Sequence, residues 1–165
     1  MPPYNLGNTL LNMNDVPGAI EKYETAVRLK PDFVEAQFNL GIALVRAGRM
    51  PEAVDRFREA VALRPTYVEG HYNLGLALVE LKRDAEAVDE FRKVIELDPK
   101  SVVVRPDLAK AYARLQRSDE AIGAAQEAAA SARASGQVEL ADKIEGWLVQ
   151  YREHLKKAEP VGKQP

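Results

Sequence analysis

Residues 36–65 read AQFNLGIALVRAGRMPEAVDRFREAVALRP, and residues 70–99 repeat this text as GHYNLGLALVELKRDAEAVDEFRKVIELDP. The Asn-Leu-Gly tripeptide lies 34 residues apart in the two copies, and it occurs once more at residues 5–7. A small residue, an aromatic residue and a proline follow each tripeptide with the same period: Ala19, Ala53 and Ala87; Tyr23, Phe57 and Phe91; Pro31, Pro65 and Pro99. This period predicts an array of small units that share a continuous core, and no single central core.

Each repeat is expected to form two helices. Apolar residues between positions 33 and 44 recur at helical spacing, and the pattern stops at Gly48, which suits a left-handed helix end. Pro51 then stands in the first turn of a second helix, where its missing N–H costs little, and that helix ends before Pro65. The turns are too short for a crossover, and no alternating segment predicts a strand. We therefore predict an all-α chain of antiparallel helix pairs.

The glycine column needs a physical reason. Gly7, Gly41 and Gly75 fall in the middle of predicted helices, where each costs about 1 kcal/mol relative to alanine. Three such costs at one register indicate that the partner helix approaches closely there. We expect the aromatic column to wedge between one repeat and the next.

A fourth copy is divergent. Leu108-Ala109 replaces Leu-Gly, and Ala125 stands in the aromatic column. We place the repeats at residues 1–33, 34–67, 68–101 and 102–135. Residues 136–158 then form one amphipathic helix, which suits a solubilising cap, and residues 159–165 are expected to be a disordered tail.

The repeat resembles the tetratricopeptide repeat family, whose 34-residue pattern is W-x₂-L-G-x₂-Y followed by A-x₃-F, A and P. The resemblance covers about residues 3–135, and the amino-acid sequence of the repeats most resembles that of O-GlcNAc-transferase-like and bacterial arrays. The tryptophan column departs from the pattern, because it holds Pro3, Gln37, His71 and Arg105. The resemblance implies a right-handed α-solenoid, a non-enzymatic scaffold for protein–protein interaction, and a concave groove lined by the first helix of each repeat.

Carried onto this sequence, the groove positions form columns that predict a peptide-binding site. The members are the ladder Asn5, Asn39, Asn73 and Asp107; the aromatic residues Tyr4, Phe38 and Tyr72; Asn8, Ile42 and Leu76; and the acidic residues Glu35 and Glu69. An asparagine amide both donates and accepts, so a ladder of them can hold the backbone of an extended peptide. The alternative is that these asparagines only bridge adjacent helices.

The chemistry of the groove suggests which partners fit. The family's carboxylate clamp uses Lys and Arg at groove positions, and no cation stands at the matching places here. Glu35 and Glu69 would repel a terminal carboxylate, so a neutral or basic protein or peptide is favoured.

Composition narrows the function classes. The net charge of −2 argues against nucleic acid, and the absence of cysteine removes disulfides and thiolate sites. No cofactor or metal is implied, no catalytic constellation is visible, and His71 stands in a packing column. Neither a membrane-spanning run nor a signal peptide is visible, so we expect no membrane insertion and a cytoplasmic location.

Two other functions stay open. No capping segment precedes the first repeat, so its open edge could stack on a second copy and make the chain a self-assembling module. The chain could also be the targeting domain of a larger enzyme, such as a glycosyltransferase.

Overall fold

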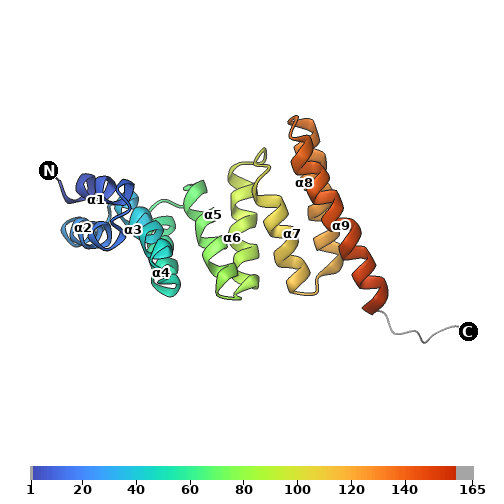
Figure 1. Ribbon diagram of the computed structural model, residues 1–165, viewed down its shortest axis with the longest axis horizontal. Coiled ribbons are helices and arrows are strands. Elements are labelled where there is room, and N and C mark those ends of the chain that lie inside the picture. Colours follow the sequence, from blue (N-terminus) through green and yellow to red (C-terminus); the bar gives the residue numbers. More distant parts are fainter. Residues whose placement is uncertain (1, 159–165) are drawn as a thin grey trace, which may run out of the picture. The chain divides into compact units, whose positions relative to one another are not determined.

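The computed structural model describes residues 2–158, and within them the chain forms nine helices and no strand (Figure 1). The all-α prediction is therefore confirmed. The chain divides into two compact units, one ending at Pro99 and the other beginning at Lys100. The repeat period does not indicate this division.

The helices follow the order of the sequence repeat. The first unit holds three pairs: α1 Pro3–Asn12 with α2 Val16–Leu29, α3 Val34–Arg46 with α4 Met50–Leu63, and α5 Val68–Glu80 with α6 Asp84–Leu97. The second unit holds α7 Val104–Arg114, α8 Ser118–Ala134 and α9 Val138–Ala158. Each predicted repeat thus contains one helix pair, and α9 occupies the predicted capping segment. The predicted disordered tail lies outside the described residues.

Consecutive pairs stack within the first unit, which gives it the arrangement of an α-solenoid. The two helices of each pair pack on each other, and α2 packs on α3 as α4 packs on α5. In the second unit α8 packs against both α7 and α9. No helix among the described residues has the length and hydropathy needed to cross a lipid bilayer.

The glycine column lets an aromatic ring lie directly on the first helix of its own pair. A Cβ atom on Gly41 would lie 2.5 Å from Cε1 of Phe57, and one on Gly7 would lie 2.7 Å from the ring of Tyr23. Gly75 meets the ring of Phe91 in the same way, and all three rings are fully buried. The close approach predicted from the sequence is confirmed. Because this contact lies inside one repeat, the aromatic residue also locks each helix pair, a role that the sequence pattern does not reveal.

The turn inside each pair uses one backbone conformation. Gly48 has φ of 74°, and the residues one period away are also left-handed although they carry side chains: Asn14, Lys82 and Gln116. Around Gly48 the N–H of Arg49 donates to the carbonyl of Leu44 at 2.9 Å, and the N–H of Gly48 donates to that of Val45 at 3.0 Å. These are the two bonds of a Schellman motif. The turn is thus kept even where the glycine is lost.

The ring-on-glycine contact predicts strong coupling between positions 41 and 57. Gly41→Ala alone should destabilise the protein by about 1–3 kcal/mol through overpacking, and Phe57→Ala by about 3–5 kcal/mol through the cavity it leaves. The double variant should cost less than the sum of the two, because removing the ring makes room for the new methyl group. Urea unfolding of all three variants measures this, and strictly additive losses would contradict the contact.

Candidate functional site

The first unit carries most of the predicted groove residues, on α1, α3 and α5. Asn5 and Glu69 are exposed, whereas the remaining members in this unit are half-buried: Tyr4, Asn8, Glu35, Phe38, Asn39, Ile42, Tyr72, Asn73 and Leu76. Asp107, also half-buried, belongs to α7 in the second unit. The structure therefore places every predicted groove residue except Asp107 in the first unit.

Asn39 is the centre of a hydrogen-bond network that joins the first two repeats. Its Nδ2 donates to Tyr4 Oη and to Asn8 Oδ1, both at 3.1 Å, and Tyr23 Oη donates to the same Asn8 oxygen at 2.8 Å. Both amide hydrogens of Asn39 are thus used inside the protein, as the helix-bridging alternative requires. Its Oδ1 accepts no hydrogen bond from the described residues.

The other two asparagines of the ladder are held differently. Asn73 Nδ2 donates to the backbone carbonyl of Glu69 at 2.8 Å, one helical turn earlier. The side chain of Asn5 makes no hydrogen bond with any residue between 2 and 158, although its carbonyl accepts one from Thr9 Oγ1. Within residues 2–158 none of the three amide oxygens accepts a hydrogen bond, and the side chains differ in how their NH₂ groups are occupied.

The aromatic column also joins one repeat to the next. The ring of Tyr4 lies 4.7 Å from that of Phe33, centroid to centroid, and the ring of Phe38 lies 5.0 Å from that of Tyr67 in an edge-on arrangement. These separations are in the favourable range for aromatic pairs. The rings of Tyr4 and Phe38 therefore each pack on the residue that caps the first helix of the following repeat.

Charge in the predicted groove is partly neutralised. Glu35 forms an ion pair of 2.6 Å with Arg64, and this hydrogen bond lowers the pKa of the Glu35 carboxyl below its usual value. Both side chains are more than two-fifths exposed, so solvent screens the pair. Glu69 is exposed, and none of the residues that the structure describes forms a salt bridge with its carboxylate. The predicted preference against an anionic partner consequently depends mainly on Glu69.

Two of the positions that hold tryptophan in the family pattern carry polar side chains here that hydrogen-bond to backbone carbonyls. His71 is buried, with Nδ1 2.6 Å from Glu90 Oε2 and Nε2 3.0 Å from the carbonyl oxygen of Pro65. One period earlier, Gln37 Nε2 donates to the carbonyl of Pro31 at 3.1 Å. Each side chain anchors its helix to the proline that precedes it. The described residues hold no cluster of three or more side chains able to bind a metal ion.

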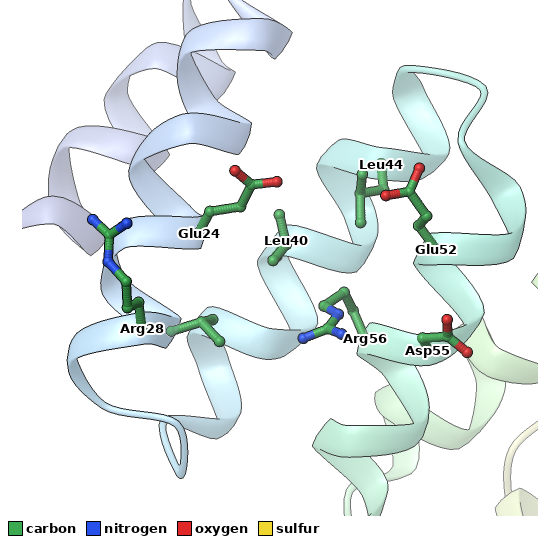
Figure 2. Close-up of a pocket in the computed structure, with 8 residues that line it drawn as sticks. Glu24, Arg28, Leu40, Leu44, Glu52, Asp55 and Arg56 are labelled. Atoms are coloured by element: carbon green, nitrogen blue, oxygen red, sulfur yellow. The ribbon is translucent and has the colours of Figure 1, made fainter.

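A pocket of about 390 Å³, not indicated by the sequence, opens between α2, α3 and α4. Figure 2 shows Glu24 and Glu52 on opposite sides of it, with Leu40 between them. The full lining is Glu24, Val27, Arg28, Leu40, Leu44, Glu52, Asp55 and Arg56. Charged side chains thus surround an apolar floor at the junction of the first two repeats.

The equivalent junction of the second and third repeats differs from this one in charge. There Arg58 forms an ion pair of 2.6 Å with Glu86. One period earlier the same positions hold Glu24 and Glu52, two carboxylates that cannot pair. The two junctions therefore differ in the sign of the charge at one repeat position, which holds Glu24 at the first and Arg58 at the second.

Replacing Glu24 by arginine should reproduce the second junction at the first. We expect Glu24→Arg to stabilise the protein by about 0.2–1 kcal/mol, the range for an exposed ion pair, and the gain should shrink at high salt. Urea unfolding is the measurement, with Glu24→Gln as a control that removes the repulsion without adding a cation. Equal gains from the two variants would show that no ion pair with Glu52 forms.

The Tyr23 network predicts sensitivity to alkali. Burial, reinforced by the neighbouring Tyr4, raises the pKa of Tyr23 from 10.0 to about 12. Since the folded protein favours the neutral phenol, this contribution to stability is complete below pH 10 and is lost as the pH rises towards 12. Circular dichroism between pH 9 and 12 should therefore show an earlier loss of helix for the parent than for Tyr23→Phe. Identical profiles would argue against the buried phenol.

A sequence model of the tetratricopeptide repeat family matches residues 4–68 and 43–102. These matches extend over more than half of the chain, and the helix pairs and the glycine and aromatic columns agree with them. The chain therefore belongs to the tetratricopeptide repeat family. No curated protein sequence matches it.

Solved structures with the same fold include several of MamA. A crystal structure of MamA has a TM-score of 0.73 and 22% sequence identity, covering 92% of this chain and 97% of that one. A second MamA structure has a TM-score of 0.75 and 21% identity, with 99% and 96% covered. A third, MamA AMB-1, has a TM-score of 0.73 and 26% identity over 76% of this chain and 69% of that chain. The helix-pair architecture thus spans nearly the whole chain.

Proposed function

We propose that the protein is a non-enzymatic interaction scaffold that holds an extended segment of a partner protein along α1, α3 and α5. Tetratricopeptide repeats in general serve protein–protein interaction, which the family membership supports for this chain. The observation that carries the finer proposal is the unused amide oxygen of Asn5, Asn39 and Asn73. One such acceptor per repeat matches the backbone N–H groups of an extended chain, which need partners wherever they are bound.

The proposed role of the ladder is therefore narrower than the sequence suggested. Asn39 can accept a hydrogen bond but has no amide hydrogen left to donate, because Tyr4 and Asn8 take both. The half-buried side chains of Ile42 and Leu76 offer apolar contact beside the ladder. The exposed Glu69 favours a neutral or basic segment over an acidic one.

Asn5 and Asn73 give the cleanest test, since neither bridges two repeats. Binders are selected from an array of synthetic peptides, and their affinity is measured by fluorescence anisotropy. We expect Asn5→Ala with Asn73→Ala to weaken binding about ten-fold, in line with the loss of two hydrogen bonds. Asn12→Ala, an exposed asparagine at the end of α1, serves as the control. Unchanged affinity in the double variant would remove the ladder from the mechanism.

A second candidate, self-association through the first repeat, has its own observation. Leu40 and Leu44 are 3% exposed, and Leu74 and Leu78 are 1% exposed. Their equivalents in α1, Leu6 and Leu10, are only half-buried. A second copy stacked on this face would bury them. Light scattering over a concentration series distinguishes the two candidates, and a monomer at the highest concentration would exclude this one.

A further inference from the structure

The second unit has lost the ring that closes each helix pair of the first unit. Ala125 on α8 stands one period after Phe91, and Ala109 on α7 stands one period after Gly75. Pro106 occupies the column that holds Tyr4, Phe38 and Tyr72. The glycine and the two aromatic residues found in each of the first three pairs are therefore replaced here by Ala109, Ala125 and Pro106.

A pocket lies at the place where those rings are missing. Its volume is about 180 Å³, and it is lined by Pro106, Ala109 and Ala125 together with Ile144 and Trp147 of α9. A cavity of about 150 Å³ with apolar walls is known to hold a benzene ring. This pocket, which we name the α7–α9 pocket, therefore has the size and the lining to take one aromatic side chain.

The charged groups at the α7–α9 pocket are cations. Lys110 and Lys143 are the only charged residues among those that line it. Of the two clefts that share residues with it, the one at Trp147 adds Arg114, and the one at Leu140 adds Glu139. Lys110 forms an exposed ion pair of 3.6 Å with Asp107 one turn earlier on α7, whereas Lys143 forms no ion pair with the described residues. A ligand that places carboxylates beside its ring would complement this rim.

One wall of the pocket is a flat aromatic surface. Trp147 of this pocket stacks on Tyr151, with ring centroids 5.1 Å apart and planes 8° apart, and both residues line the cleft that adjoins the pocket at Trp147. Tyr151 Oη lies 3.2 Å from Ser118 Oγ on α8, which ties α9 to α8 at this point. An incoming ring would thus meet a wall that is already held in place.

We propose that the α7–α9 pocket docks one aromatic side chain of a partner protein whose neighbouring residues are acidic. The ring takes the space that Phe57 and Phe91 fill in their own repeats, and the flanking carboxylates pair with Lys110 and Lys143. This surface is separate from the asparagine ladder of the first unit, and it selects the opposite charge. It therefore goes beyond the proposed scaffold function and can succeed or fail independently of it.

Trp147 is the only tryptophan of the chain, so its fluorescence reports directly on the pocket. Three matched peptides are titrated into the full chain, each with a central phenylalanine flanked by glutamate, by glutamine or by lysine. We expect a saturable change in Trp147 emission with the glutamate peptide, at a Kd about five-fold or more below that of the glutamine peptide. The lysine peptide should not bind, and a glutamate peptide with alanine in place of phenylalanine should lose binding.

Two kinds of variant test separately the positive charge at the rim of the pocket and the space inside it. Lys143→Glu should abolish the preference for the glutamate peptide, whereas Lys157→Glu, the same change at an exposed position of α9 outside the pocket, should leave it intact. Ala109→Gly with Ala125→Phe should restore the ring found in the first three repeats and block the pocket from within. Circular dichroism shows whether this double variant folds, and the Lys143→Glu result stands without it.

Three outcomes would overturn the proposal. The first is no saturable signal from the glutamate peptide up to about 1 mM, the limit of weak specific binding. The second is equal or tighter binding of the glutamine or lysine peptide, or no effect of Lys143→Glu. The third is a shift of Trp147 emission with protein concentration alone, which would assign the pocket to a second copy of the chain. The Asn5→Ala and Asn73→Ala variants should leave this binding unchanged, so failure here is distinguishable from failure of the ladder.

Discussion

The packing of an aromatic ring against a helical glycine is the contact on which the first unit depends. The ring of Phe57 lies so close to Gly41 that no Cβ fits between them, and the same holds for Tyr23 on Gly7 and Phe91 on Gly75. The glycine is unfavourable for the helix that contains it, yet it admits a large buried ring that holds the two helices at one separation. Repetition of this separation allows consecutive pairs to stack with the same geometry. Burial of the phenol at Tyr23 and the close pairing of the groove rings follow from it.

The fourth repeat shows what happens when this contact is replaced. Alanine at both positions 109 and 125 exchanges a ring on a glycine for two small side chains, and both are buried in a cluster with Ile144 and Leu148. Packing is thus retained through α9, which supplies apolar side chains that the hairpin lacks. The space of the missing ring is only partly refilled, because a pocket remains beside Trp147. The absence of the internal ring and the presence of the pocket thus go together in this repeat.

Side chains at equivalent positions of different repeats have different neighbours, so they form different interactions. Glu24 and Glu52 line a pocket at the first junction, whereas their equivalents at the second junction, Arg58 and Glu86, form an ion pair. Asn39 uses its NH₂ group to hold two repeats together, whereas Asn73 turns the same group onto its own helix. The solenoid therefore repeats its backbone while its surface changes from one repeat to the next.

The sequence by itself determined the helix pairs, their order and the close approach at the glycine column, because these depend on short-range spacing and on residue size. It also placed the groove residues of the first three repeats on equivalent helices. Only the tertiary structure decided that Asn39 is a bridge, that Arg64 neutralises Glu35, and that pockets open at Glu24 and beside Trp147. These features arise between side chains that are distant in the sequence. The repeat period shows which residues occupy equivalent positions, whereas the contacts between their side chains are seen only in the folded structure.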